Sequence, residues 1–494
     1  MVSGAEYMKI AFVINQVQYS IPLGIAYCAA VLKNRGFDCQ VFEISHNEER
    51  AQAELCAYSP DVIGFSLYSG THQGLIRLSE RLKGRLKFIG IFGGPHATFF
   101  PEIIQDSGVD AVCLGEGELA LAEFMEQYRE KGAIPTDIAN FWIKDGNKIF
   151  KNKVRPLISR LDSLPFPDRM IFIKKYPIFN LHGIKHFLAH RGCPYHCTFC
   201  FNHAFNRIYG ISGRDCYHSR SPENICEEIE LERGRMKLDM ISFVDDCFSL
   251  DREWTMDFCK VYRERVNLPF QINTRVENLD ADRIAALASA NCWLIHIGVE
   301  SGNEDYRKKV LKRGMSNQLL ISTIKLCRQA GIHILTENMI GLPSEGYDGA
   351  INTLKLNFEA APDFSAASFF TPYPKLELTR FAVEEGVYQD EVGELPEDYM
   401  HRTLLQFDSP SEKRRIINLR SFFNLSVRYP RLWPIFNFLT KLPPNPLFRI
   451  IGDIADGFFL WKILPYRISL KDFFLLVWQY ITSYRKIMGR GVSN

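Results

Sequence analysis

Residues 190–203, HRGCPYHCTFCFNH, contain the most informative stretch of this chain. Cys193, Cys197 and Cys200 follow one another with the spacing C-x3-C-x2-C, directly after an apolar run, IKHFLAHRG (184–192), that predicts a β-strand. We therefore expect three thiols on one loop at the carboxyl end of a strand. Soft thiolate ligands on a short loop suit an iron–sulfur cluster or a zinc ion.

The cluster and the zinc ion differ in the ligands they require. A cluster held by three cysteines leaves one iron open for a substrate or cofactor, whereas structural zinc needs a fourth protein ligand. His196 and His203 are near enough in sequence to complete a zinc site. Zinc sites of this kind usually add a second, distant ligand pair, which the chain lacks. We favour the cluster and keep zinc as the alternative.

Alternating strand and helix patterns continue after the cysteine loop. The strand candidates are IKHFLAHRG, MISFVDDCF (240–248), FQINTRV (270–276), WLIHIGVE (293–300), HILTENMIGLP (333–343) and AASFFTP (366–372). Helical patterns over 222–236 and 281–290 lie between them. Six such units in so short a segment predict an open, partial (βα)6 barrel, since closed eight-stranded barrels need roughly 250 residues.

Residues 8–130 show the same alternation and predict an α/β domain of the flavodoxin-like, Rossmann type. Its strand candidates include KIAFVIN, CQVFEI, DVIGFSL, KFIGIFGG and AVCLGEGE, with a helix over 25–35 after the first. These runs end in small residues, namely Ser66, Ser69, Gly93, Gly94, Gly115 and Gly117. Open sheets bind ligands at this edge, although glycines here can also serve only as turns.

Five motifs together resemble the radical S-adenosylmethionine (SAM) superfamily. They are the triplet with Phe199 before its last cysteine, FVDDCF (243–248), NTR (273–275), GVESG (298–302) and MIGLPSE (339–345). The resemblance implies a [4Fe-4S] cluster on Cys193, Cys197 and Cys200, with SAM on the fourth iron. It also implies SAM contacts from Phe199 and Ile340 to the adenine, Asp245 or Asp246 to the methionine amino group, Glu300 and Ser301 to methionyl or ribose atoms, and Arg275 to the carboxylate. A purely structural charge is the alternative for Asp246 and Arg275.

An α/β domain before such a barrel resembles the cobalamin (B12)-dependent radical SAM class, which includes methyltransferases and the anaerobic magnesium-protoporphyrin ester cyclase. The resemblance implies a corrin or its nucleotide tail surrounded by Ser66, Tyr68, Ser69, Gly93, Gly94, His96, Gly115, Gly117 and Glu118. The motif D-x-H-x-x-G, which supplies an axial histidine in other cobalamin proteins, is missing, because this loop reads INQVQYS (14–20). A domain that kept the fold and lost the cofactor is the alternative.

Four segments follow from these patterns: a B12-binding-like domain at 1–135, a linker with little regular structure at 136–180, the radical SAM barrel at 181–375 and a helical region at 376–494. Residues 411–494 carry 14 basic and 4 acidic residues among many aromatic ones. That composition suits helices that pack on the barrel or lie on an anionic membrane. Within the barrel, TPYPKLEL departs from the pattern of the resemblance, because Lys375 stands where many relatives carry glycine.

Thirteen cysteines without a disulfide pattern, no secretory signal and no long apolar run predict a cytoplasmic protein that does not span a membrane. Cys28, Cys39, Cys56 and Cys113 form no second ligand triplet, which disfavours a methylthiotransferase. A basic excess confined to the tail disfavours a nucleic-acid partner.

The resemblance implies SAM cleavage to a 5′-deoxyadenosyl radical and methylation of an unactivated carbon of a small or lipid-like substrate. An electron donor such as flavodoxin or ferredoxin would serve it. Radical oxidation or cyclisation without methyl transfer is the second hypothesis, and a non-catalytic cobalamin or cluster sensor is the third.

Overall fold

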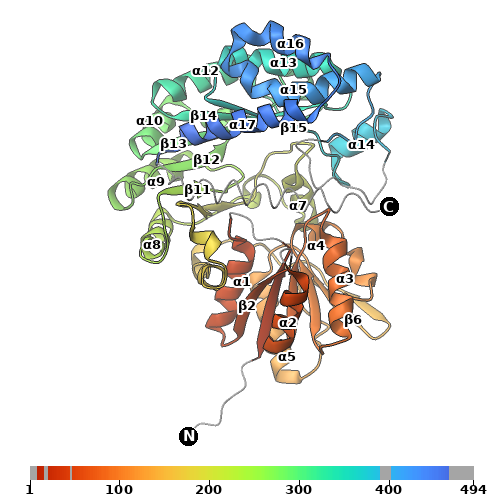
Figure 1. Ribbon diagram of the computed structural model, residues 1–494. Coiled ribbons are helices and arrows are strands. Elements are labelled where there is room, and N and C mark those ends of the chain that lie inside the picture. Colours follow the sequence, from red (N-terminus) through yellow and green to blue (C-terminus); the bar gives the residue numbers. More distant parts are fainter. Residues whose placement is uncertain (1–7, 16–19, 45–46, 390–401, 467–494) are drawn as a thin grey trace. The chain divides into compact units, whose positions relative to one another are not determined.

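The computed structural model describes residues 8–15, 20–44, 47–389 and 402–466. The chain divides into two compact units (Figure 1). The first comprises Met1–Leu181 and Phe205–Ile211, and the second comprises His182–Ala204 and Ser212–Asn494.

The first unit is built on a seven-stranded sheet with the order β2-β1-β3-β4-β5-β6-β7. Its parallel strands are β1 (Lys9–Ile14), β2 (Asp38–Glu43), β3 (Val62–Ser66), β4 (Ile89–Gly93) and β5 (Ala111–Cys113). The order 2-1-3-4-5 is that of flavodoxin-like folds, so the predicted fold class of this unit is confirmed. The strands read as nearly continuous apolar runs because helices cover both faces of a parallel sheet.

Five helices connect these strands: α1 (Leu23–Asn34), α2 (Glu48–Tyr58), α3 (His72–Lys83), α4 (Pro95–Phe99) and α5 (Glu118–Lys131). One core cluster joins sheet and helices, with Phe65 and Phe92 stacked at 4.5 Å between ring centroids and Leu75 and Leu78 of α3 fully buried. The predicted helix over 25–35 corresponds to α1.

The expectation of little regular structure in the segment 136–180 was wrong for its first part. Strands β6 (Phe141–Asp145) and β7 (Lys148–Lys151) form an antiparallel hairpin that extends the sheet beyond β5. Gly146 at the turn has φ +56°, and Phe141 and Ile143 are fully buried. The alternating pattern FWIKD was too short to distinguish from a loop, and pairing with β5 stabilises it. A short helix, α6 (Met170–Ile173), follows.

The second unit contains a six-stranded parallel sheet with the order β15-β14-β13-β12-β11-β8. Its strands are β8 (Ile184–Phe187), β11 (Met240–Phe243), β12 (Phe270–Thr274), β13 (Cys292–Glu300), β14 (His333–Ile340) and β15 (Phe364–Phe369). They coincide with the six strand candidates, which confirms the partial (βα)6 barrel. Two short strands, β9 (His190–Arg191) and β10 (His218–Ser219), form a separate antiparallel pair.

Helix α7 (Phe201–Tyr209) follows the cysteine loop and is divided between the two units at Phe205. The helices of the barrel are α8 (Pro222–Arg233), α9 (Arg252–Arg265), α10 (Ala281–Ser289), α11 (Glu304–Lys309), α12 (Asn317–Gln329) and α13 (Gly346–Ala360). Several begin at a side chain that accepts a hydrogen bond from a first-turn amide, as Ser221, Asp251, Asp280 and Ser316 do. Such caps satisfy otherwise unpaired amides and fix where each helix starts after its loop.

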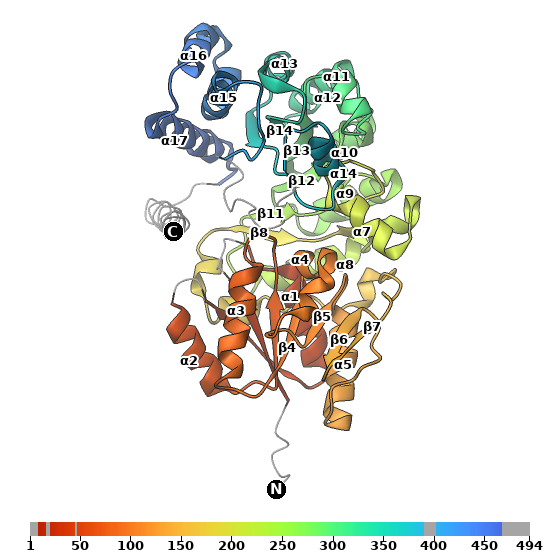
Figure 2. The ribbon, with the colours of Figure 1, turned by 90° about the vertical axis from the view of Figure 1, so that its right-hand side faces the viewer.

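The C-terminal part is helical where the structure describes it, with α14 (Glu377–Glu384), α15 (Pro410–Arg428), α16 (Trp433–Thr440) and α17 (Pro446–Ile463). Helix α15 packs on the sheet and α13 through Leu419 and Phe423, which share a core cluster with Ile340 and Leu354. Helices α16 and α17 lie on α15 (Figure 2). The apolar stretch LKDFFLLVWQYITSYRKIMGR (470–490) lies outside the described residues. Within the described part, no helix is both long and apolar enough to cross a bilayer.

Candidate functional site

The loop that carries the three cysteines is anchored within the second unit. Gly192, just before it, has φ +82°, and a Cβ there would lie 1.9 Å from the Cys216 carbonyl oxygen, so only glycine fits. The Thr198 hydroxyl donates to the Val310 carbonyl at 2.8 Å and its amide donates to the Leu311 carbonyl at 3.3 Å. These bonds fix the loop at the carboxyl end of the barrel strands.

The three thiols lie in a largely buried environment. Cys193 and Cys197 are buried and Cys200 is half-buried. Burial raises the pKa of Cys193 well above its usual value and that of Cys200 to about 11. Within the described residues, no three Cys, His, Asp or Glu side chains converge on one metal-ion position. A four-iron cluster does not need that convergence, because each thiolate binds a different iron.

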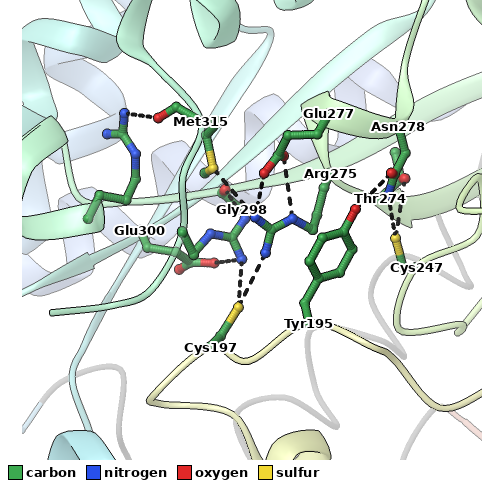
Figure 3. Close-up of polar contacts among 12 residues, drawn as sticks. Tyr195, Cys197, Cys247, Thr274, Arg275, Glu277, Asn278, Gly298, Glu300 and Met315 are labelled. Atoms are coloured by element: carbon green, nitrogen blue, oxygen red, sulfur yellow. Dashed lines mark hydrogen bonds and ion pairs between the residues drawn. The ribbon is translucent and has the colours of Figure 1, made fainter. Parts of the chain in front are cut away.

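Two guanidinium groups face the sulfur of Cys197 (Figure 3). Arg275, after β12, donates from Nη1 at 3.3 Å, and Arg313 approaches the same sulfur from Nη1 at 3.8 Å. Both arginines are buried. Paired cations beside a thiolate favour a negatively charged sulfur ligand and suit the anionic assembly of three thiolates and a cluster.

Neighbouring groups hold Arg275 in this position. Its Nε and Nη2 atoms donate to the Glu277 carboxylate, and its guanidinium carbon lies 3.9 Å from the ring centroid of Tyr195 (Figure 3). The Tyr195 hydroxyl in turn donates to Asn278 Oδ1 at 2.8 Å. Arg275 was predicted beside the SAM carboxylate; in the structure its hydrogen-bond partners are a cysteine, a glutamate and the sulfur of Met315.

Glu300 ends β13 in the left-handed region, with φ +66°, at a shift in the register with β14. Its carboxylate lies 3.6 Å from Arg313 Nη1. Burial raises the pKa of Glu300 to about 7, and Arg313 acts in the opposite direction. Arg313 also donates to the Gly298 carbonyl at 2.6 Å, so it links the cysteine loop to the GVESG motif.

Ser301 is fully buried and donates to Glu345 Oε1 at 2.7 Å. This bond joins the GVESG and MIGLPSE motifs. Burial raises the pKa of Glu345 to about 7, while the Ser301 bond and Arg307 oppose that rise. At Gly302 a Cβ would lie 2.3 Å from the Asn352 carbonyl oxygen of α13, so the motif requires glycine for close packing.

The two aspartates of FVDDCF occupy different environments. Asp245 is buried, and its Oδ1 accepts from the amides of Ala189 and His190 and contacts His190 Nδ1 at 3.0 Å. Asp246 has an exposed side chain. Neighbouring groups still remove part of the water around its carboxyl and raise its pKa, and a hydrogen bond from Asn202 acts in the opposite direction. Asp245 thus holds the strand before the cysteine loop, and Asp246 is the aspartate accessible to a ligand.

The two apolar positions also differ. Phe199 is partly buried and packs against a cluster that includes Leu311, Leu342 and Phe370. Ile340 is buried at the end of β14 within the cluster shared with α15. Phe199 therefore keeps exposed surface for a ligand, whereas the Ile340 side chain serves the core.

The histidines considered for zinc are otherwise engaged. His203 Nε2 lies 3.1 Å from Glu377 Oε1, and its ring stacks on that of His196 at 4.6 Å between centroids. The Glu377 contact directs His203 toward α14. The closeness of these histidines to the cysteines in sequence therefore no longer supports a zinc site.

The loops after β3, β4 and β5 lie side by side at the carboxyl edge of the first unit's sheet. The Leu67 amide donates to the Gly93 carbonyl at 2.8 Å, and the His96 amide donates to the Leu67 carbonyl at 3.2 Å. Gly94 has φ +92°, and a Cβ there would lie 2.9 Å from the Leu67 oxygen. The structure thus brings Ser66, Gly93 and Gly94 together.

A histidine pair stands at this edge. Ser69 Oγ lies 3.0 Å from Nδ1 of the buried His96, whose ring stacks on His72 at 3.8 Å between centroids. His72 Nδ1 is buried with no hydrogen-bond partner, and burial lowers the His72 pKa. Tyr68 is 56 % exposed. The unbonded His72 nitrogen and the exposed Tyr68 ring both lie within residues 68–72 after β3, and this combination fits a large, amide-rich ligand such as a corrin.

The third loop holds Gly115, Gly117 and Glu118. The Gly115 amide donates to Thr98 Oγ1 at 3.0 Å, which ties this loop to α4. The Glu116 amide donates to the Tyr209 hydroxyl at 3.2 Å, and a Cβ on Gly115 would lie 1.9 Å from that oxygen. Glu118 is buried at the start of α5.

Arg313, Glu277, Glu345, His72 and Tyr209 were missed by sequence reasoning. Each stands outside the quoted motifs or at a motif's end, and distance along the chain hides the contact it makes. The sequence held no signal for these contacts, because the burial of a charged residue becomes visible only once the fold is known.

Two family models match this chain. The B12 binding domain matches residues 11–125, and the Radical SAM superfamily matches residues 188–356. The first match covers the flavodoxin-like sheet and its loops, and the second covers the cysteine loop and most of the barrel.

Curated relatives extend over most of the chain. An uncharacterized methyltransferase of Pyrococcus horikoshii is 24% identical over 401 residues, covering 77% of this chain and 84% of the relative. The anaerobic magnesium-protoporphyrin IX monomethyl ester cyclase of Cereibacter sphaeroides is 25% identical over 72% of this chain and 59% of its own length. The hopanoid C-3 methylase of Methylococcus capsulatus is 26% identical over 72% of this chain and 67% of its own length.

Among solved structures, the cobalamin-dependent S-adenosylmethionine radical enzyme OxsB, with aqua-cobalamin and S-adenosylmethionine bound, has the same fold. Its TM-score to this chain is 0.68 at 15% identity, over 97% of this chain and 76% of that chain.

This chain combines a Radical SAM domain with a B12 binding domain. It is a radical SAM enzyme with an N-terminal B12 binding domain, and its cofactors are a [4Fe-4S] cluster, SAM and cobalamin. Enzymes of this class act on small molecules and need a reductant.

Proposed function

We propose that this chain is a cobalamin-dependent methyltransferase that places a methyl group on an unactivated carbon of a small or lipid-like molecule. The observation that carries the proposal is the presence, in one chain, of a B12 binding domain and a radical SAM domain whose cysteine loop faces two arginines. Two of the three relatives described above are named as methyltransferases or methylases.

We propose Cys193, Cys197 and Cys200 as the cluster ligands. Three thiols on one anchored loop, two of them buried, and two guanidinium groups at Cys197 support this assignment. Neutral thiols must lose their protons to bind iron, and nearby cations lower the free energy of the resulting thiolates.

For SAM, we propose contacts from the exposed Asp246, the exposed face of Phe199, and Glu300 with Ser301 at the end of β13. Asp245 would hold the strand before the loop, and Arg275 would act on the cluster through the Cys197 sulfur. We also propose the direct contacts, from Asp245 to the methionine amino group of SAM and from Arg275 to its carboxylate. The side chain of Ile340 is buried, so Ile340 would contact the adenine of SAM through its backbone. The paired cations and carboxylates suit a zwitterionic ligand.

For cobalamin, we propose the edge formed by Ser66, Tyr68, Ser69, Gly93, Gly94, His96, Gly115, Gly117 and Glu118. Glycines at this edge let a large planar ligand approach the backbone closely. We propose four segments along the chain. Residues 1–135 would bind cobalamin, and residues 136–180 would connect them to residues 181–375, which would bind the cluster and SAM. Residues 376–494 would form the C-terminal region.

When bound, the reduced cluster would supply the electron that splits one SAM into methionine and a 5′-deoxyadenosyl radical, and cobalamin would carry a methyl group taken from a second SAM. The chain orients them and keeps water away from the buried Cys193 and Cys197. Arg275 and Arg313 stabilise negative charge at Cys197, and Glu277 and Tyr195 keep Arg275 in place. We propose a cytoplasmic location and a flavodoxin- or ferredoxin-type electron donor.

The test uses anaerobically purified, reconstituted protein with methyl-labelled SAM, a strong reductant and an extract of small molecules and lipids. Label in an extracted product, 5′-deoxyadenosine in solution, and loss of both in the Cys193→Ala, Cys197→Ala, Cys200→Ala triple variant support the proposal. Substrate turnover with 5′-deoxyadenosine but no label in the product refutes methyl transfer.

Cyclisation or oxidation without methyl transfer is the second candidate, favoured by the similarity to the magnesium-protoporphyrin ester cyclase. The unlabelled product of the same experiment identifies it. Absence of 5′-deoxyadenosine under every condition would support the third hypothesis, a sensor.

A further inference from the structure

Helices α16 and α17 and the turn before them present a large apolar surface to solvent. We call it the outer face, and its exposed side chains are Tyr429, Leu432, Ile435, Phe438, Leu447, Ile450, Ile451, Ile454, Phe458, Leu460 and Trp461. Ile454 is 67% exposed and Phe438 is 60% exposed. Scattered exposed leucines are ordinary, but eleven exposed apolar side chains within residues 429–461 mark an interaction surface.

The polarity of α17 is inverted relative to an ordinary surface helix. Its acidic residues point inward, where Arg420 donates to Asp453 at 2.9 Å and Asn424 donates to Asp456 at 2.9 Å. Gly452 packs against α15 so closely that a Cβ would lie 2.4 Å from the Ser421 oxygen. The apolar stripe therefore faces outward with polar bonds behind it, so rotation of the helix to bury the stripe would break those bonds.

The charges around the outer face are of one sign. Residues 428–463 contain five basic residues, Arg428, Arg431, Lys441, Arg449 and Lys462, and two acidic ones. Both acidic residues are the inward-facing Asp453 and Asp456. Lys462 Nζ lies 4.6 Å from the centroid of the exposed Phe458 ring. Basic side chains beside exposed Ile, Phe and Trp are the composition of helices that lie in a lipid interface.

We propose that the outer face docks this enzyme on an anionic phospholipid bilayer, with α16 and α17 lying in the interface. The apolar side chains enter the boundary between headgroups and acyl chains, and the basic residues contact lipid phosphates. Docking is peripheral, in line with the absence of a bilayer-spanning helix in the described part of the chain. The inference does not depend on methyl transfer.

Two other occupants fit the charges less well. The segment 467–494, which follows α17, has five basic residues and one acidic residue, so it carries the same sign as the face it would cover. A second copy of the chain would bring the same basic residues against themselves. An anionic bilayer satisfies the apolar stripe and the positive charge together.

The experiment measures co-flotation of the full-length, reconstituted protein with vesicles of phosphatidylcholine alone or mixed with phosphatidylglycerol. The test variant is Phe438→Glu with Ile454→Glu. The matched control is Leu319→Glu with Leu326→Glu, which alters exposed apolar residues of α12 that are 37% and 38% exposed. Circular dichroism, thermal melting and iron content establish that each variant is folded and loaded.

We expect wild type and control to float with the anionic vesicles, and the test variant to bind more than about tenfold more weakly. Added salt should weaken wild-type binding. No flotation of wild-type protein overturns the proposal, as does equal flotation of the test variant. A concentration-dependent dimer that the test variant abolishes, without vesicle binding, assigns the face to a second copy. Flotation that appears only after removal of residues 467–494 assigns it to that segment. Vesicle binding without labelled product contradicts the proposed function alone.

Discussion

Replacement of Arg275 by Gln should lower the reduction potential of the bound cluster. Arg275 donates to Cys197 at 3.3 Å, and this cation stabilises the more negative, reduced cluster more than the oxidised one. A hydrogen bond to a charged group contributes about 1.5 to 3 kcal/mol. For one electron, about 1.4 kcal/mol corresponds to about 59 mV, so the full bond sets a limit of about 65 to 130 mV. Part of the bond energy is common to both oxidation states, and we expect a decrease on the order of 50 mV.

A variant at Glu277 should shift the reduction potential of the cluster in the opposite direction. Its carboxylate accepts two bonds from Arg275, so Glu277→Gln leaves the guanidinium charge less compensated and should raise the potential. Arg252→Gln, at an exposed arginine paired with Asp282, is the control and should leave it unchanged. Anaerobic redox titrations followed by electron paramagnetic resonance measure all three, with iron content equal to that of wild type. Shifts of the same sign for Arg275→Gln and Glu277→Gln, or no shift beyond about 20 mV in either, would refute the reasoning.

Three further predictions concern stability. Burial raises the folded-state pKa of Asp456 to about 6, above its unfolded value, so this group destabilises the fold progressively as pH rises from about 4 to 6. Asp456→Asn should therefore increase the free energy of unfolding at pH 8, on the order of 1 kcal/mol, and leave it nearly unchanged at pH 4 in denaturant titrations. Gly302→Ala should lower the free energy of unfolding by about 2 kcal/mol or more, because the added Cβ meets the Asn352 oxygen. Gly457→Ala is the control: it has open space in α17 and should leave the free energy of unfolding unchanged or raise it. Equal melting temperatures of the two variants would contradict this. Lys375 has φ +68°, so Lys375→Gly should raise the free energy of unfolding by about 0.5 to 1 kcal/mol, and a decrease would count against strain there.

Spacing along the chain could predict those features that local physics fixes. The C-x3-C-x2-C triplet needs only one loop to place its thiols together, and the alternation of apolar runs with helical patterns is enough for two parallel sheets. The hairpin of β6 and β7 could not be predicted in this way. Its short strands depend on pairing with β5, and that pairing joins residues about thirty positions apart.

The roles of individual polar residues depended on contacts between distant segments. Asp245 and Asp246 are adjacent in sequence, yet Asp245 is buried against His190 while Asp246 faces solvent. No pattern distinguishes two neighbouring aspartates, because strand and loop geometry set their directions. Arg313 reaches Cys197 from 116 residues away for the same reason.

The sequence by itself determined the order of the two α/β parts, the cysteine triplet and the glycine-rich strand ends, because each rests on periodicity or on residues within one loop. Only the tertiary structure decided that two arginines meet one cysteine sulfur, that His72 stacks on His96, and that α17 turns its aspartates inward and its isoleucines outward. The physical reason is that electrostatic pairing and burial act through space, whereas sequence patterns report only the repeat of the local backbone.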